Sequence, residues 1–291
     1  MIKRKLNVII MSFSMALSFS ACDSDSDYES KSTQNFSDCF HHVYNTETGE
    51  AAIFDSPRYT IEFDYASGKA NVEVKNVKFA EGMPAINMTL ADLTWTWSST
   101  TGFKSISATD VVPVVNGKVM PEYIISSFKF DILDRYMGVN YLPVVRITFA
   151  INEKYVVTAV QKQICYYGKT NVLTAGSPTA FNTESPYYLA EISEDLTADL
   201  KIYDAQFATS MPPMNMVFGD IPVIVNPSVG YVLTADSLIP EIGDTPYPDY
   251  EITALSGNAN FMTGLSLTFR CMSVFTVTAT LGFAPSEETM N

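Results

Sequence analysis

The feature that most constrains how this 291-residue chain folds is an internal repeat. Residues 70–74 resemble residues 198–202, and a Met-Pro pair occurs at both 83–84 and 211–212, all at an offset of 128. Further matches keep the same order along the chain, at offsets between 120 and 129. Self-similarity that keeps its order in this way indicates that one structural unit was duplicated, with loops of different lengths inserted.

The repeat divides the chain into two units, which we place at residues 36–160 and 161–284. Each unit holds about 125 residues, enough to bury a core of its own. No Pro- or Gly-rich linker separates the units, because a strand-like run over 155–167 carries the chain from one into the next. We therefore predict two homologous domains that are joined as a fairly rigid pair.

Within each unit apolar residues alternate with polar ones, which is the pattern of a half-buried strand. The alternation over 70–74 shifts phase before Phe79, and the second copy shows the same shift before Phe207. A phase shift kept in both copies predicts a β-bulge or a bend. The same reasoning predicts further strands at 36–43, 58–65, 86–97, 103–108, 123–132, 143–152 and 155–165.

Eight short strands in about 125 residues predict an all-β fold, either two tandem antiparallel β-barrels or, alternatively, two β-sandwiches. Each unit has an alternating strand that ends in Phe, a Met-Pro turn, an Asn-Met strand and a closing Thr-Phe hairpin followed by Val-Thr-Ala. This order is similar to the calycin-like (lipocalin-like) β-barrel lipoproteins of Bacteroidetes. The resemblance covers residues 36–284 in two copies. It implies a barrel fold, and since many of these families have no known function, it supplies no catalytic residues.

The amino-terminal segment has the composition of a secretion signal. Residues 3–5 are basic, and the apolar run over 6–19 is too short to span a hydrocarbon core of about 30 Å. The run ends in the sequence Leu-Ser-Phe-Ser-Ala-Cys at 17–22, which resembles the lipobox of bacterial lipoproteins, although Phe19 stands where Leu is usual. We therefore predict a lipoprotein signal peptide at 1–21.

This reading predicts that Cys22 is acylated and anchors the mature protein to the outer membrane. Ordinary secretory cleavage after Ser20 is the alternative. Residues 22–35, which begin with alternating Ser and Asp, are expected to form an acidic flexible tether. An acidic run directly after a lipidated Cys resembles the surface-export signal of Bacteroidetes lipoproteins, which implies a position facing the cell exterior; the periplasmic face is the other possibility.

The charge of the chain argues against nucleic acid as a partner. Its 32 acidic and 18 basic residues give a formal net charge of −14, whereas nucleic-acid binding depends on Lys and Arg contacts to phosphates. The sequence contains no nucleophile elbow, P-loop or dinucleotide fingerprint. Its only histidines, His41 and His42, are adjacent on a predicted strand and so point to opposite faces. We expect no catalytic residue, no metal site and no cofactor.

Trp95 and Trp97 are the only tryptophans, and they lie two residues apart on one face of a predicted strand. Paired aromatic rings suggest a ligand-binding site that stacks against a sugar. The second copy has Val223 and Val225 at these positions, which favours the interpretation that both tryptophans are interior. In a barrel, however, an inward face can also line a ligand cavity.

A second candidate for ligand binding lies in a loop that only the first unit has. The offset falls from 127 to 120 between Ile125 and Thr148, so the first unit holds about seven extra residues. They fall near Arg135, Tyr136 and Tyr141, a combination of aromatic residues and arginine that is typical of binding surfaces. An ordinary hairpin loop is the alternative.

If Cys22 carries lipid, three cysteines remain, and an odd number allows at most one intramolecular disulfide. Cys39 and Cys165 match each other in different units, and Cys271 matches the apolar Ile151. We therefore expect all three to be buried free thiols.

Together these patterns predict a non-catalytic binding module that is anchored in the outer membrane and exposed at the cell surface. Its ligand would be a small apolar molecule, a glycan or a protein. The alternative is a structural subunit of a fimbria-like surface assembly, because Bacteroidetes pilins are also acidic two-domain β lipoproteins. A hydrolase that depends on His41 or His42 is the third hypothesis.

Overall fold

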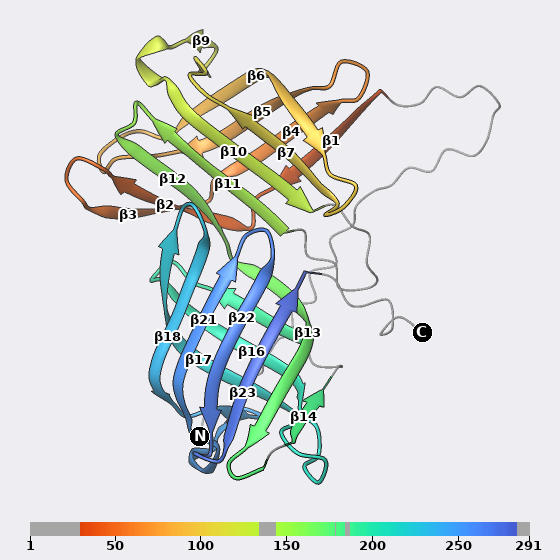
Figure 1. Cartoon of the computed structure of the whole chain (residues 1–291). Helices are drawn as coiled ribbons and strands as arrows, with labels where there is room; N and C mark the ends of the chain where they lie inside the picture. Colours follow the sequence, from red (N-terminus) through yellow and green to blue (C-terminus); the bar gives the residue numbers. More distant parts are fainter. Residues whose placement is uncertain (1–29, 134–143, 178, 184–186, 284–291) are drawn as a thin grey trace, which may run out of the picture.

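The computed structural model describes residues 30–133, 144–177, 179–183 and 187–283. This part of the chain consists of β-strands, turns and two 3₁₀ helices, and it forms two antiparallel sheets (Figure 1). No helix within it is long and apolar enough to cross a membrane.

The first sheet contains twelve strands within the described residues. They are β1 Lys31–Phe36, β2 Cys39–Asn45, β3 Ala51–Asp55, β4 Arg58–Asp64, β5 Lys69–Val77, β6 Ile86–Trp97, β7 Phe103–Ala108, β8 Val114–Val115, β9 Lys118–Val119, β10 Ile125–Leu133, β11 Val144–Ile151 and β12 Tyr155–Gln161. Neighbouring strands pair in the order β1-β4-β5-β6-β7-β10-β11-β12-β2-β3. The pairing is therefore open between β1 and β3, and we call this sheet the open barrel.

The second sheet contains eleven strands within the described residues. They are β13 Gln163–Thr174, β14 Ala180–Thr183, β15 Tyr187–Ile192, β16 Thr197–Ala205, β17 Met214–Asn226, β18 Gly230–Leu238, β19 Glu241–Ile242, β20 Thr245–Pro246, β21 Ile252–Asn260, β22 Gly264–Cys271 and β23 Phe275–Gly282. Because β16 pairs with both β15 and β17, eight of these strands form a complete circuit. We call this sheet the closed barrel; its strands follow one another around the circuit in chain order, apart from the short strands outside it.

The two sheets are built from strands in the same succession. Each has a short hairpin, β8–β9 or β19–β20, that leads into a 3₁₀ helix, Pro121–Tyr123 or Pro248–Tyr250. The difference lies at the first strand. In the closed barrel the long strand β13 pairs with both β15 and β23, whereas in the open barrel the chain divides into β1, which pairs with β4, and β2, which pairs with β12.

These features confirm the predicted all-β class and its antiparallel barrels, and the closed circuit rules out the sandwich alternative. The strands predicted at 58–65, 86–97 and 103–108 agree with β4, β6 and β7 to within one residue. Two details are wrong. Residues 31–35, assigned to the tether, form most of β1, because their backbone pairs antiparallel with β4. The run predicted at 155–165 ends at Gln161, and Lys162 separates it from β13.

The phase shift seen in the sequence is a β-bulge in both barrels. The register of β5 against β6 shifts between Val74 and Val77, and that of β16 against β17 shifts between Ile202 and Ala205. The bulged residues, Asn76 and Asp204, have φ values of 59° and 55°. Asn and Asp tolerate this left-handed conformation better than most residues.

A second pair of bulges accounts for the two aspartates that recur beside the Leu93 and Ile221 positions. Asp92 and Asp220 have φ values of 56° and 57°. The backbone N–H of Asp92 donates to Asn71 Oδ1 at 3.0 Å, and that of Asp220 donates to Asp199 Oδ1 at 3.2 Å. These aspartates therefore serve the bending of the strands.

The interior of each barrel is filled by large side chains. Inward residues of the strands are almost fully buried, and the largest of them are aromatic. In the open barrel these are Tyr59, Phe63, Phe128, Phe130 and Phe149. In the closed barrel they are Tyr166, Tyr188, Phe207, Phe218, Tyr231 and Phe269. Packing of this kind contributes roughly 1.5–3 kcal/mol per buried side chain, and it leaves the inward faces committed to the core.

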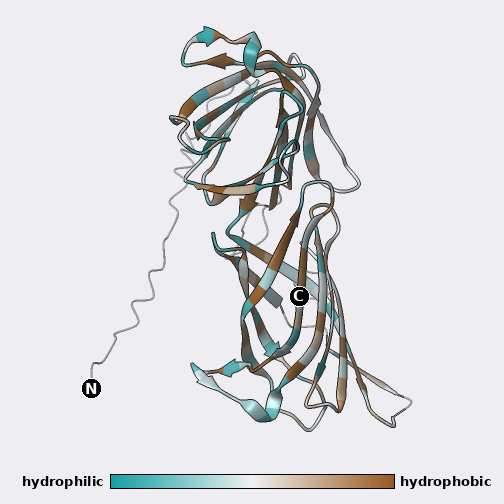
Figure 2. Ribbon diagram, turned by 90° about the vertical axis from the view of Figure 1, so that its left-hand side faces the viewer, coloured by the Kyte–Doolittle hydropathy of each residue, from teal (hydrophilic) through white to brown (hydrophobic). Residues whose placement is uncertain are grey.

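The two barrels pack against each other, with one end of the closed barrel against the outer face of the open barrel (Figure 1). Figure 2 looks into the open barrel and shows the closed barrel from the side. Phe40 and Val160, which point out of the open barrel, are fully buried in the core of the closed barrel. Phe103, in turn, belongs to a small cluster with Met262 and Phe283 of the second sheet.

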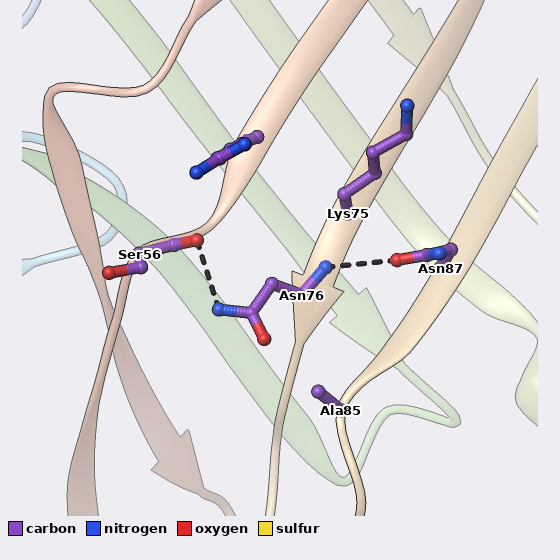
Figure 3. A pocket seen from close by; sticks show the side chains of 6 residues that line it. Ser56, Lys75, Asn76, Ala85 and Asn87 are labelled. Atoms are coloured by element: carbon purple, nitrogen blue, oxygen red, sulfur yellow. Dashed lines mark hydrogen bonds between the residues drawn. The ribbon is translucent and has the colours of Figure 1, made fainter.

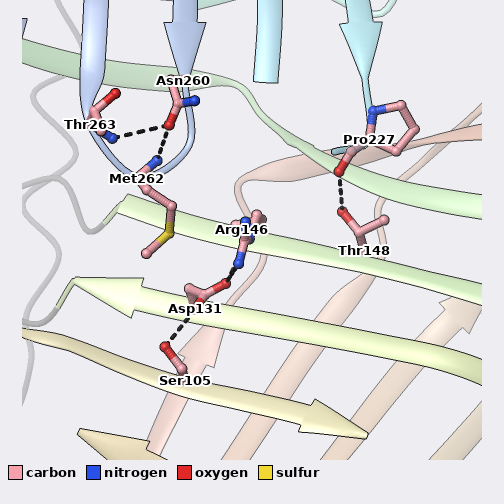
Figure 4. Close-up of polar contacts among 8 residues, drawn as sticks. All are labelled: Ser105, Asp131, Arg146, Thr148, Pro227, Asn260, Met262 and Thr263. Atoms are coloured by element: carbon pink, nitrogen blue, oxygen red, sulfur yellow. Dashed lines mark hydrogen bonds and ion pairs between the residues drawn. The ribbon is translucent and has the colours of Figure 1, made fainter. Parts of the chain in front are cut away.

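Polar contacts accompany this junction (Figure 4). Thr148 Oγ1 donates to the carbonyl oxygen of Pro227 at 3.5 Å. Asp131, only 4% exposed, accepts hydrogen bonds from Arg146 and from Ser105, whose Oγ lies 2.5 Å from Asp131 Oδ1. A carboxylate at this depth is stable because a guanidinium and a hydroxyl both bind it.

Closure of the second barrel depends on close strand contacts at glycines. Gly264 has a φ of +106°, and a Cβ at this position would overlap the carbonyl oxygen of Leu281, whereas a Cβ at Gly282 would meet no atom within 4 Å. We predict that Gly264→Ala lowers the free energy of unfolding by about 3 kcal/mol, and that Gly282→Ala changes it by less than about 0.5 kcal/mol. Urea denaturation followed by tryptophan and tyrosine fluorescence measures both; equal stability of the two variants would contradict the prediction.

Candidate functional site

Aromatic side chains gather at one end of the open barrel, where β4, β6 and the β4–β5 turn meet. Trp95 is half-buried and lies edge-on to Phe63 and to Tyr65, with ring centroids 5.2 and 5.3 Å away. Its indole N–H donates to the backbone carbonyl oxygen of Asp64 at 3.3 Å. Trp95 is therefore fixed in place from both sides, partly in the core and partly at the surface.

Lys104 and Ser32 add polar groups to these rings. Lys104 Nζ lies 3.3 Å from Tyr65 Oη, and it sits over the Phe63 and Tyr65 rings at 5.2 and 5.8 Å from their centroids. Ser32 Oγ lies 2.9 Å from the same Tyr65 hydroxyl. A cation over aromatic faces is attracted to them by the ring quadrupole. The lysine is thus held beside the rings, next to exposed hydroxyl groups.

Trp97 completes the group, which we call the aromatic rim: Trp95, Trp97, Tyr65, Lys104 and Ser32. It pairs with Lys104 across the β6–β7 hairpin and is 61% exposed. The interpretation of both tryptophans as interior is therefore wrong for Trp97. Val225, the equivalent residue of the closed barrel, packs against the core of that barrel, near the end that meets the open barrel. Trp97 stands past the core layers of the open barrel, so its ring reaches solvent.

The extra loop of the first unit leaves the barrel at this same end. Ten residues separate β10 from β11, against three between β21 and β22, which confirms the predicted insertion of seven residues. Leu133, before the loop, pairs with Phe103, and the neighbouring Lys104 pairs with Trp97. The loop residues singled out in the sequence, namely Arg135, Tyr136 and Tyr141, lie outside the described residues.

Sequence reasoning identifies the two tryptophans but not the rest of the aromatic rim. Tyr65, Lys104 and Ser32 are far apart in the sequence, and none of them belongs to a recognisable motif. Strand register alone brings them together: β1 carries Ser32 next to β4, and β7 carries Lys104 beside β6. The one available signal is Tyr65, an aromatic residue at the last position of the strand predicted at 58–65.

Two hollows open on the outer surface of the described part of the chain. One, of about 230 Å³, lies over the start of β4 and the end of β5 (Figure 3). The other, of about 540 Å³, lies beside the junction of the barrels, and half of its ten lining residues are acidic. At its edge Lys162 forms ion pairs with Asp55 at 3.0 Å and with Glu194 at 3.1 Å, which links the two units.

The two histidines lie on opposite faces of β2, and both are buried. His41 points into the open barrel, where its Nε2 lies 2.5 Å from Tyr59 Oη and its Nδ1 has no partner. Burial lowers the pKa of His41 to about 3 and also lowers the pKa of His42. Within the described residues, no group of three His, Cys, Asp or Glu side chains is arranged to hold a metal ion.

Thr170 is the residue of the closed barrel that is equivalent to His41. His41 pairs with Ala159, and Thr170 pairs with the corresponding Ala279. The Thr170 hydroxyl lies 2.8 Å from Tyr188 Oη. Each barrel therefore holds a buried tyrosine hydroxyl at the same position, with histidine as the partner in one copy and threonine in the other.

Cys39, Cys165 and Cys271 are buried free thiols, as expected. The match of Cys39 with Cys165 is wrong, because the strand register places Gly168 at the position equivalent to Cys39. Burial raises the pKa of each, to about 12 for Cys271, so all three stay protonated near neutral pH. Because the thiolate is the nucleophilic form, these cysteines pack as apolar side chains. Cys22, the predicted lipidation site, lies outside the described residues.

The buried histidine makes stability depend on pH. Because the pKa of His41 is about 3 in the folded protein and about 6.5 in an unfolded chain, unfolding takes up a proton between these values. The free energy of unfolding therefore falls as the pH decreases below 6.5, by about 1.4 kcal/mol per unit for this group. We predict that His41→Thr, which copies the second barrel, makes this acid dependence shallower by about one proton.

Urea denaturation between pH 7 and pH 4 measures the slope. Tyr59→Phe is the control, because it removes the hydroxyl partner but keeps the buried ring and hence the proton uptake. An acid dependence that is unchanged in His41→Thr would contradict the prediction.

Comparisons with known proteins found one solved structure and no family or curated sequence. No protein-family model matches the chain, and no curated protein sequence matches it. One solved structure, provisionally described as an outer membrane protein of Bacteroides fragilis, aligns with 88% of this chain and 98% of its own, at 12% identity. The TM-score is 0.32, which is too low to indicate a shared fold.

Proposed function

We propose that the chain is a lipoprotein of the outer membrane, exposed at the cell surface, and that it binds a glycan without acting on it. The aromatic rim carries this proposal. Trp97 presents a large apolar ring to solvent, and Trp95 and Tyr65 lie beside it in fixed positions. Exposed aromatic anchors of this kind are typical of binding sites.

The packing of the barrels supports a ligand at the rim rather than inside. Large aromatic side chains fill both interiors, so a small apolar molecule would have to displace part of a packed core. At the aromatic rim a ligand can contact the rings without displacing side chains of the core. The order of the eight strands in the closed barrel, consecutive around the circuit, supports the resemblance to calycin-like barrels.

The polar groups of the rim favour a sugar among the possible ligands. Sugars have apolar C–H faces that stack on rings and hydroxyl groups that both donate and accept hydrogen bonds. Lys104 supplies a donor, and the hydroxyls of Tyr65 and Ser32 can act either way. A purely apolar ligand would leave these groups unused.

A binding role also agrees with the state of the groups that a hydrolase would use. His41 is enclosed in the core and His42 is only 8% exposed, so neither reaches the rim. The fimbrial alternative would need an unpaired strand edge that accepts a strand from another subunit. In the closed barrel each of the eight strands pairs on both sides, so that barrel has no such edge, whereas β1 and β3 of the open barrel each pair on one side only.

The rim is tested by Trp97→Ala. Because Trp97 is mostly exposed, we predict that the change lowers glycan affinity at least about tenfold while the melting temperature stays within about 2 °C of the wild type. Ile224→Ala is the matched control, since Ile224 is 62% exposed on the closed barrel. A glycan array identifies the ligand and isothermal titration calorimetry measures the affinity. Equal glycan affinity in the Trp97→Ala and Ile224→Ala variants would contradict the proposal that the aromatic rim is the binding site.

The anchor is tested by Cys22→Ser. We predict that the wild-type protein, made in a bacterium that processes lipoproteins, incorporates labelled palmitate and partitions into the detergent phase of Triton X-114. The variant is expected to do neither, because the thiol is the acceptor of the lipid. Protease added to intact cells then distinguishes the cell exterior from the periplasmic face. Palmitate incorporation by Cys22→Ser would contradict the assignment.

A further inference from the structure

The smaller hollow on the open barrel is lined by two cations and two amides (Figure 3). Arg58, the first residue of β4, lies directly opposite Lys75 of β5. Asn76 and Asn87 lie beside them; the Asn76 backbone N–H donates to Asn87 Oδ1 at 3.2 Å, and the Asn76 side chain donates to the carbonyl oxygen of Ser56 at 3.0 Å. We call this group the cationic hollow.

The pairing of Arg58 with Lys75 works against the stability of the sheet. Side chains directly opposite in an antiparallel pair lie close together, and like charges there are destabilising. Glu73 lies 3.2 Å from Lys75 and offsets part of the repulsion. Arg58 forms no ion pair with any described residue. In a chain with only 18 basic residues against 32 acidic ones, this local excess of positive charge is unusual.

The closed barrel has two stacked aromatic rings where the open barrel has these two cations. Tyr187 and Tyr203 occupy the positions of Arg58 and Lys75, and their rings stack at 4.3 Å with an angle of 11° between them. The framework beneath is unchanged, because the Asp204 backbone N–H donates to Asn215 Oδ1 at 3.1 Å, as Asn76 does to Asn87. The copies differ in these two outward side chains and in the bulged residue, which is Asn76 in the open barrel and Asp204 in the closed barrel.

We infer that the cationic hollow is an oxyanion-binding site, which takes a carboxylate, sulfate or phosphate group. The Arg58 guanidinium can donate two parallel hydrogen bonds to such an oxyanion, and the Lys75 ammonium adds a second positive charge. An anion between the two cations would also relieve their mutual repulsion. The volume of about 230 Å³ suits one such group with part of the molecule that carries it. The anion belongs either to an acidic glycan or to free phosphate.

This site is separate from the aromatic rim and does not depend on it. Arg58 begins β4, whereas Tyr65 follows the end of the same strand, which places them roughly 20 Å apart at about 3.3 Å per residue. A long acidic glycan could reach both, but each site can be tested alone.

The test measures melting temperature and calorimetric binding of the purified mature protein with four probes: inorganic phosphate, inorganic sulfate, tetragalacturonate and neutral maltotetraose. We expect an oxyanion to raise the melting temperature of the wild type by a few degrees, whereas maltotetraose at the same ionic strength leaves it unchanged. A response to tetragalacturonate identifies an acidic glycan as the source, and a response to phosphate alone identifies the free ion.

The decisive variant is the double substitution Arg58→Tyr with Lys75→Tyr, which copies the second barrel. We expect it to melt above the wild type without any anion and to lose at least tenfold in anion affinity. Arg58→Gln is a milder variant in case the tyrosines do not pack. Lys129→Gln, which removes an exposed charge elsewhere, should keep the response. The inference is overturned if no oxyanion acts on the wild type, or if Lys129→Gln loses the response as fully as Arg58→Gln.

Discussion

Closing an antiparallel sheet into a barrel requires sharp bends at particular points, and the rest of this structure depends on how the chain makes them. Each barrel bends β5 or β16 at a residue with positive φ, and an asparagine on the next strand accepts a hydrogen bond from its backbone N–H. A second bulge, at Asp92 or Asp220, is held from the preceding strand in the same way. These four contacts let the inward side chains meet in one core on both sides of each bend.

The same framework carries different surfaces in its two copies. One end of the closed barrel is covered by the open barrel, so residues there are apolar and join the shared core, as Phe40 does from the other side. The matching end of the open barrel has no such cover among the described residues, and there Trp97 is exposed. An outward face of the two barrels also differs: the open barrel has Arg58 opposite Lys75, where the closed barrel has two stacked tyrosines. The two barrels thus share a scaffold, and the binding surfaces that we propose lie where their side chains differ.

Much of the fold could be predicted because it is written in local patterns. Alternation along 86–97 and 103–108 predicted strands at those positions, and the phase shift before Phe79 predicted a bulge. The prediction was wrong where the outcome depends on a distant partner. Residues 31–35 look like a polar tether, yet they form β1 because β4 lies alongside with its backbone groups unpaired on that side. Cys39 was matched to Cys165 rather than to Gly168 because only the pairing of β13 with β23 reveals the register.

The sequence by itself determined that this chain is acidic and all-β, and it predicts an internal repeat and an export signal, because charge, two-residue alternation and self-similarity can be read without knowing which residues are in contact. Only the tertiary structure decided which residues lie together. It placed Ser32, Tyr65 and Lys104 beside the tryptophans, set Arg58 against Lys75, and enclosed His41 in a core. The physical reason is strand register: a shift of one residue turns every side chain to the other face of the sheet, and register is settled by the packing of the whole barrel.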